Sequence, residues 1–113
     1  NLRVAALKDV DLSNAAFILT DLSFADLGES NLNGAILALA NLTRTNLRYA
    51  SMRGADLRRA QLTDAILQGA DLRNANLQGA SVTDEKLKSA GSLEGATMPN
   101  GEMYHDGYFS SEW

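Results

Sequence analysis

The chain has 113 residues, of which 45% are hydrophobic and 21% charged, and its formal net charge is −4. This length is typical of one domain, and the acidic balance does not favour nucleic acid as a partner. There is no cysteine, which excludes a disulfide framework, a thiolate metal site and a cysteine nucleophile. No apolar run approaches the ~18 residues of a membrane-spanning helix, so we predict no membrane insertion.

Residues 1–82 follow an unbroken five-residue repeat. Every fifth residue from Leu2 to Val82 is large and apolar, without one exception among 17 positions. The position two residues before each of them is small, and from position 5 to position 80 it holds alanine in 12 of 16 cases. The position in between is often Asp or Asn, as in Asp26, Asn41 and Asp56.

A period of five excludes the common elements. On an α-helix five residues advance the side chain by roughly 140°, so the leucines would form no stripe, and a long strand needs a period of two. Within one unit, however, the small and the large apolar residue are two positions apart, so they lie on the same side of a short extended segment. The remaining residues must turn the chain before the next unit begins. The repeat therefore predicts a β-helix-like coil filled by stacked Leu and Ala.

Four glycines stand immediately before an inward alanine, where the backbone must bend: Gly34, Gly54, Gly69 and Gly79. We interpret them as structural. A phosphate-binding loop would need a preceding strand and a following helix start, and neither is predicted here.

Four units read Ala, then Asp or Asn, then Leu, then two variable residues: 25–29, 40–44, 55–59 and 75–79. In this pattern residues 1–82 resemble the pentapeptide-repeat family, and the ending of the chain is similar to those of cyanobacterial members. The resemblance implies an all-β solenoid, a right-handed quadrilateral β-helix with four units per coil and about four coils. Some members of this family inhibit or protect DNA gyrase, which makes mimicry of duplex DNA an alternative function.

The repeat is predicted to end near Val82, because Glu85 would bring a charge into the next small position. A short helix is expected over 84–90, with Thr83 or Asp84 as its N-cap and Gly91 just past its end. Such a helix would cover the open end of the apolar stack.

The pattern then divides the chain into three parts. A pentapeptide-repeat β-helix occupies 1–82, and a C-terminal cap of a short helix and a partial repeat, one residue out of register, occupies 83–98. The tail, 99–113, opens with a Pro-Asn-Gly turn and is rich in aromatic residues, including Trp113. We interpret the tail as folded back on the coil or mobile, with a docking peptide as the alternative.

Nothing in the sequence indicates catalysis. A packed coil offers no cleft for a nucleophile and a base or for paired carboxylates, and the one histidine, His105, lies in the tail. The Asp and Asn side chains are expected to form ladders along the coil, where their carboxylates do not converge. We therefore predict no enzymatic activity, no cofactor and no metal site.

Two groups of outward residues are candidates for binding. With 20 residues per coil, as the resemblance implies, Ile18 stacks on Ala38, Ala16 on Ile36 and Leu19 on Leu39. This gathers Ile18, Leu19, Ile36 and Leu39 into a contiguous aliphatic patch, which can mark an interaction surface. The alternative is that a small solenoid exposes these residues incidentally. The second group is a candidate anion-facing cluster of arginines: Arg48, Arg53, Arg58, Arg59 and Arg73. Its ordinary interpretation is a solvated face.

We therefore predict a non-catalytic scaffold that presents a solenoid surface for protein–protein binding, with an unidentified protein partner or self-association. The alternatives are DNA mimicry directed at an enzyme such as gyrase, which a short rod with arginines at its waist disfavours, and polyanion binding through the arginines. The cytoplasm is the favoured location, and the periplasm or the thylakoid lumen is the alternative if a leader was removed before Asn1.

Overall fold

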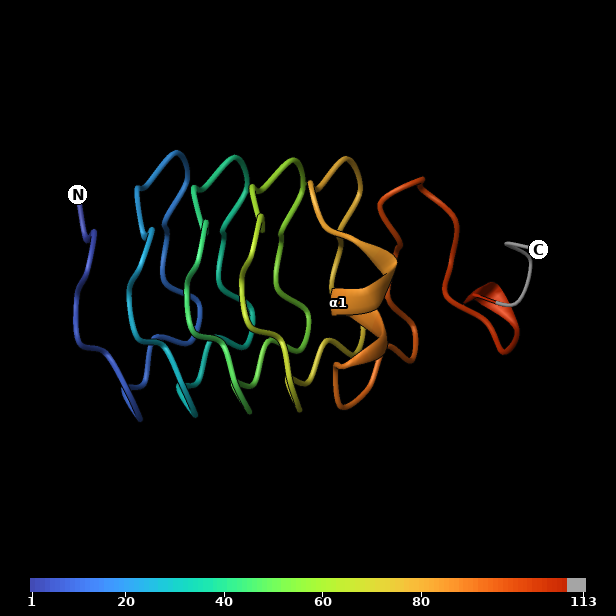
Figure 1. Cartoon of the computed structure of the whole chain (residues 1–113), viewed down its shortest axis with the longest axis horizontal. Helices are drawn as coiled ribbons and strands as arrows, with labels where there is room; N and C mark the ends of the chain where they lie inside the picture. Colours follow the sequence, from blue (N-terminus) through green and yellow to red (C-terminus); the bar gives the residue numbers. More distant parts are fainter. Residues whose placement is uncertain (110–113) are drawn as a thin grey trace.

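The computed structural model describes residues 1–109 and shows a rod with principal dimensions of 39 × 19 × 19 Å. The chain winds as a stack of similar turns from the N-terminus at one end of the rod toward the C-terminus at the other (Figure 1). Parallel β-bridges join residues 20 positions apart, for example Ala6 to Asp26 and Asp26 to Asn46. Each turn therefore contains four five-residue units. The bridges are isolated, so the described residues contain no extended strand and a single α-helix, α1 (Asp84–Lys88), besides a 3₁₀ turn at Tyr108 and Phe109.

Each unit ends in the same tight corner. The alanine N–H donates to the carbonyl of the leucine three residues earlier, as from Ala5 to Leu2 (3.0 Å) and from Ala35 to Leu32 (3.0 Å). The residue just before the alanine has a positive φ, which is the geometry of a type II turn. Twelve residues other than glycine adopt this conformation: Val4, Asp9, Asn14, Leu19, Phe24, Glu29, Leu39, Arg44, Tyr49, Arg59, Asp64 and Asn74.

The core confirms the predicted inward positions. The large apolar residues from Leu22 to Leu77 are at most 1% exposed, and the alanines between them are buried with them. Where the small position is polar, its hydroxyl finds a carbonyl inside the coil: Thr45 Oγ1 donates to the Leu22 carbonyl at 2.8 Å. In the first turn Leu2 and Leu7 are only half-buried, since no described turn lies above them.

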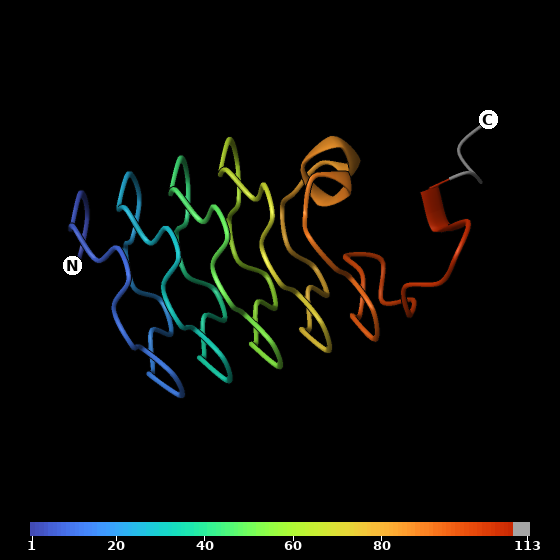
Figure 2. The same ribbon diagram turned by 90° about the horizontal axis from the view of Figure 1, so that it is seen from below.

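The helix is shorter than expected and does not end the coil. Thr83 is the N-cap, but α1 stops at Lys88, two residues before the expected end at Ala90. It occupies one side of the fifth turn, where two units would otherwise lie (Figures 1 and 2). The coil then resumes with bridges from Asp71 to Ser92 and from Asn76 to Thr97.

This resumption differs from the expected closure near Val82. These last bridges span 21 residues instead of 20, because the segment that contains α1 is one residue longer than two repeat units. The partial unit is thus one residue out of register, as predicted, and it is part of the core: Ala96 and Met98 are fully buried.

The start of the tail folds back on the last turn. Thr97 and Met103 form an antiparallel bridge, and the Tyr104 N–H donates to the Ala96 carbonyl at 2.8 Å. The rings of Tyr108 and Phe109 pack edge to face with their centroids 5.1 Å apart, half-buried against the core. Residues 110–113, including Trp113, lie outside the described residues.

Leu57 offers a test of the core. It is fully buried in the third turn. Leu57→Ala should lower the free energy of unfolding by about 2–5 kcal/mol because it leaves a cavity. Leu57→Asp should prevent folding, since a buried unpaired charge costs several kcal/mol out of a total of about 5–15. Guanidinium denaturation followed by far-ultraviolet circular dichroism measures both, with the exposed Gln68→Ala as the control. Cooperative unfolding of Leu57→Asp near the wild-type midpoint would contradict the assignment.

Two corner glycines with the same backbone but different surroundings test the corner. Gly54 and Gly69 have φ values of +67° and +69°. A Cβ on Gly54 meets nothing within 4 Å, whereas a Cβ on Gly69 would overlap the ring of Tyr49 from the turn above. We expect Gly54→Ala to cost about 1 kcal/mol, the price of the left-handed conformation, and Gly69→Ala to cost more. Thermal unfolding should show the excess disappear in a Tyr49→Ala background, and equal costs for both alanines in wild type would refute this account.

Candidate interaction surface

The four aliphatic residues predicted as an interaction surface lie together in the first two turns. We call Ile18, Leu19, Ile36 and Leu39 the aliphatic patch. Its side chains are exposed by 53%, 73%, 37% and 45%, respectively. The two turns are joined beneath the patch by the bridge from Ala16 to Ile36 and by the hydrogen bond from the Leu19 N–H to the Ala38 carbonyl (3.2 Å). The expected stacking of these residues is therefore present, and the role of the patch stays a prediction.

The backbone beneath the patch is unusual for its side chains. Leu19 and Leu39 both occupy the left-handed corner position, with φ values of 60° and 61°. This conformation costs an L-residue roughly 1–2 kcal/mol and is favoured by Gly, Asn and Asp, which fill the position in other units, as Asn14 and Gly79 do. The two leucines thus combine backbone strain with exposure to water, and neither contributes to the buried core.

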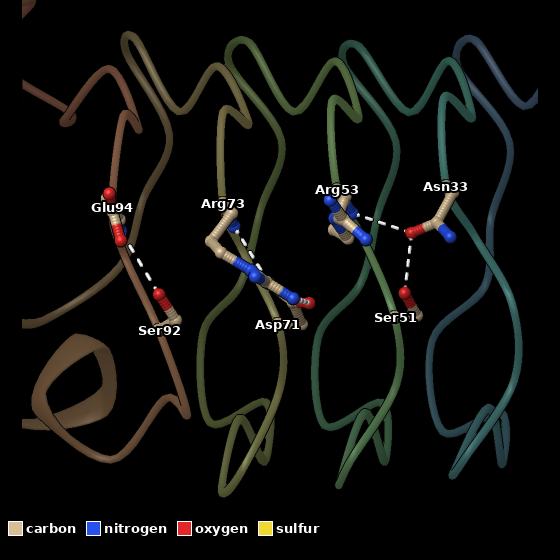
Figure 3. Close-up of polar contacts among 7 residues, drawn as sticks. All are labelled: Asn33, Ser51, Arg53, Asp71, Arg73, Ser92 and Glu94. Atoms are coloured by element: carbon tan, nitrogen blue, oxygen red, sulfur yellow. Dashed lines mark hydrogen bonds and ion pairs between the residues drawn. The ribbon is translucent and has the colours of Figure 1, made fainter.

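The arginine group does not form one cluster. In the 20-residue register, Arg48 lies at one corner of the coil, Arg53 and Arg73 share the next, and Arg58 and Arg59 share the one after that. Arg53 stands over Arg73 as predicted, on neighbouring turns (Figure 3). The grouping along the sequence therefore does not correspond to convergence in space.

The corner that carries Arg53 and Arg73 is a row of polar contacts (Figure 3). Arg73 binds Asp71 through two parallel hydrogen bonds, Nε to Oδ1 at 2.9 Å and Nη2 to Oδ2 at 2.6 Å. One turn earlier, Asn33 Oδ1 accepts from Ser51 Oγ at 2.6 Å and from the Arg53 N–H at 2.8 Å. The Asn33 contacts link two successive turns of the coil, whereas the Arg73–Asp71 pair lies within one repeat unit.

Two of the five arginines form ion pairs with a carboxylate, and the other three form none with a described residue. Hydrogen bonds from the Arg73 side chain are the main cause that holds the pKa of Asp71 below its ordinary value, and Arg58 lowers the pKa of Asp56 in the same way. Arg58 is bound to Asp56 by two hydrogen bonds of 2.8 and 2.7 Å. By contrast, no carboxylate of another described residue lies within 4.0 Å of the guanidinium of Arg48, Arg53 or Arg59.

A groove that the sequence did not suggest adjoins the aliphatic patch. It has a volume of about 610 Å³ and runs from the second turn to the fifth. Its lining residues are Ala38, Leu39, Arg58, Arg59, Gln78, Gly79, Pro99 and Asn100. Leu39 belongs to both the patch and the groove. The sequence could have predicted part of this groove, because every twentieth residue from Leu19 is Leu39, Arg59 and Gly79, and these residues lie in line on successive turns.

Within residues 1–109, no three His, Asp or Glu side chains are arranged to hold a metal ion. The ring of His105 lies in the tail, with Nδ1 2.9 Å from the carbonyl oxygen of Asp106. The described part of the chain has no helix of the length and hydrophobicity that crossing a bilayer requires.

Comparison with known sequences identifies the class of protein that this coil defines. The family model of pentapeptide repeats matches the chain in eight copies, over residues 1–38, 20–59 and 40–79. The chain belongs to the pentapeptide-repeat family. A search of curated proteins found no match to it.

The chain is also similar to solved structures of particular proteins. A pentapeptide repeat protein from the thylakoid lumen of Arabidopsis thaliana is 30% identical, with a TM-score of 0.70 over 86% of this chain and 63% of that protein. HetL, a protein involved in the regulation of heterocyst differentiation in the cyanobacterium Nostoc sp. strain PCC 7120, is 41% identical, with a TM-score of 0.51 over 88% of this chain and 43% of HetL.

QnrB1, a plasmid-mediated fluoroquinolone resistance protein, is 20% identical and aligns with 72% of this chain and 38% of its own, with a TM-score of 0.63. That likeness shows the fold alone. The chain spans less than two thirds of the length of each of these three proteins.

The Asp71–Arg73 pair predicts a specific pH dependence. Because folding lowers the pKa of Asp71 below its ordinary 3.8, its carboxylate contributes stability that is complete above that pH and is lost as the pH falls through the lowered value. Asp71→Asn should lower the free energy of unfolding at pH 7 by no more than about 1 kcal/mol, since both side chains of the pair are only half-buried. The difference from wild type should be smaller at pH 2 than at pH 7, because the Asp71 carboxylate becomes protonated as the pH falls. Urea denaturation at both pH values measures this.

The matched control is Asp64→Asn, whose partner Arg44 lies 3.8 Å away and is more exposed. It should change stability little at either pH. A deficit of Asp71→Asn that is the same at pH 7 and pH 2 would show that the charge of Asp71 is irrelevant.

Proposed function

We propose that this chain is a non-catalytic scaffold that binds a protein partner through the aliphatic patch. The observation that carries the proposal is the contiguous exposure of four aliphatic side chains, the aliphatic patch, on two neighbouring turns. The backbone strain at Leu19 and Leu39 adds to it, although other corner residues such as Val4 and Tyr49 share that strain. A corner glycine or asparagine would relieve the strain and remove apolar surface from water, so the monomer gains nothing from leucine there. Strain that persists without a structural benefit favours a functional explanation.

The fold supports this role. As in the rest of the family, the coil is proposed to wind as a right-handed quadrilateral β-helix. α1, with Leu87 buried in the core, is proposed to act with residues 91–98 as its C-terminal cap. Such a packed coil holds its surface residues at fixed spacing, which suits recognition. The regulatory role stated for HetL is consistent with a partner-binding scaffold.

Two alternatives have less support. Polyanion binding would need converging free arginines, yet the five occupy three corners, and Arg58 and Arg73 are already bound to Asp56 and Asp71. DNA mimicry would need an acidic rod, whereas this coil carries arginines in its middle turns. Likeness to QnrB1 at 20% identity does not carry a function across.

The double variant Leu19→Asn/Leu39→Asn tests the proposal. Since Asn tolerates the left-handed conformation, the variant should unfold at the same free energy as wild type or up to about 1 kcal/mol higher. Affinity capture from an extract of the source organism, quantified by mass spectrometry, should show a defined set of proteins lost by the variant.

Tyr49→Asn is the matched control, because Tyr49 is 58% exposed, also has a positive φ of 57° and lies at a different corner. It should retain the captured proteins. Identical captured sets for wild type and the double variant, with both proteins monomeric by light scattering, would reject the proposal.

A further inference from the structure

The aliphatic patch continues into a cationic groove along one corner of the coil. The left-handed position of that corner holds Leu19, Leu39, Arg59 and Gly79 in four successive turns. The corner is thus apolar over two turns, cationic in the third, and open in the fourth, where glycine leaves no side chain. Pro99 and Asn100 close the far end of the groove.

Arg59 is the free charge in this groove. A Cβ built on Gly79 would lie 3.0 Å from Arg59 Cγ, so the stem of Arg59 runs along the corner above that glycine. Its guanidinium has no carboxylate of a described residue within 4.0 Å, while the adjacent Arg58 is held by Asp56. Like the two leucines, Arg59 has a positive φ, of 58°, in place of a cheaper Gly or Asn. The same strain therefore recurs at three consecutive positions that face one strip of surface.

The strip is complementary to an acidic, aliphatic peptide. Successive turns lie about 4.8 Å apart, so Leu19 and Arg59 are separated by roughly 10 Å. Three residues of a polyproline II segment span about this distance at ~3.1 Å each, and its period of three residues per turn brings the first and fourth side chains to the same side. The apolar end would take an aliphatic side chain, Arg59 a carboxylate, and the amides of Gln78 and Asn100 the peptide backbone.

A second copy fits the strip less well. A two-fold antiparallel pairing centred between Leu39 and Arg59 would place a cation against a leucine. A pairing centred between Leu19 and Leu39 would cover the leucines but leave Arg59 and the groove without an occupant. Nucleic acid would find a single free arginine and apolar surface, whereas its phosphates need several cations. Charge complementarity therefore selects the peptide.

We infer that the aliphatic patch and the groove together bind a peptide in the polyproline II conformation with an aliphatic residue and, three residues away, a carboxylate. This inference rests on the proposed scaffold function and specifies the chemistry of its partner.

The test uses two synthetic ten-residue peptides with Leu-Ser-Ser-Glu or the reverse, Glu-Ser-Ser-Leu, flanked by Gly-Ser, because the direction of binding is open. Each is titrated into the ¹⁵N-labelled full chain. At least one should shift the amide signals of Leu39, Arg59, Gly79 and Asn100 in a saturable manner. Replacement of its Glu by Gln or Lys should weaken binding at least threefold. Raising the salt from 50 to 500 mM should weaken only the acidic peptide.

Protein variants distinguish peptide binding at the aliphatic patch and the groove from non-specific electrostatic binding. Arg59→Gln should weaken binding of the acidic peptide at least threefold and leave the Gln peptide unaffected. Leu39→Asn should weaken both peptides. Arg48→Gln, an arginine without an ion pair at a different corner, should change neither.

Several results would overturn the inference. Equal binding of the Glu and Gln peptides would remove Arg59 from the site. A dimer in light scattering that Leu39→Asn dissociates would make a second copy the occupant, and shifts of these amides by a duplex oligonucleotide without shifts by either peptide would favour nucleic acid. Absence of binding by both peptides, with capture still lost in Leu19→Asn/Leu39→Asn, would reject the peptide chemistry and leave the scaffold standing. If neither peptide binds and the double variant captures the same proteins as wild type, both the peptide chemistry and the scaffold function are rejected.

Discussion

The corner at the end of each five-residue unit is the constraint from which the rest of the structure follows. Its hydrogen bond, from the alanine N–H to the leucine carbonyl, is made in a type II turn, in which the residue before the alanine has a positive φ. The corner brings the next Ala and Leu back to the inside of the coil. It also places the N–H of each leucine near the carbonyl of a residue one turn further on, as for Leu22 and Asn41 at 2.8 Å. One local conformation, repeated, thus creates the core and the ladder together.

This division of labour determines where function can lie. The inward small and large residues are committed to the core, and the Asp or Asn between them stabilises its own corner, as when the Gly28 N–H donates to Asp26 Oδ1 at 3.0 Å. The two corner residues are free to vary in chemistry, although one of them must accept the left-handed conformation. We therefore expect a functional surface on this coil to be formed by the corner residues. Corner residues one turn apart lie in rows along the rod and form continuous strips.

The sequence predicted the burial, which depends on one unit, and the 20-residue coil implied by the resemblance predicted the stacking of Leu19 on Leu39 and of Arg53 over Arg73. It missed the fifth turn and the separation of the arginines among three corners. The five-residue period alone identified the buried residues from Leu22 to Leu77, because burial is decided within each unit. The fifth turn was missed, since Glu85 breaks the pattern in a segment that becomes α1, and its extra residue is compensated only when Ser92 pairs with Asp71. The arginines were grouped by proximity in the sequence, yet neighbours five residues apart lie at different corners, and only residues one turn apart stack.

The aliphatic patch and the groove show that a stable repeat can contain residues in an unfavourable backbone conformation. Each left-handed leucine or arginine costs roughly 1–2 kcal/mol relative to a relaxed backbone, a large part of the margin by which a small domain is stable. The coil sustains this because its bridges and buried leucines hold each corner from both neighbouring turns. Relaxed residues such as Asn14, Asp64 and Gly79 fill the same position elsewhere. Because Val4, Phe24 and Tyr49 are exposed with the same conformation, strain alone does not mark the strip. The strip is distinguished by the continuity of its aliphatic side chains with a groove that contains an arginine without an ion pair to any described residue.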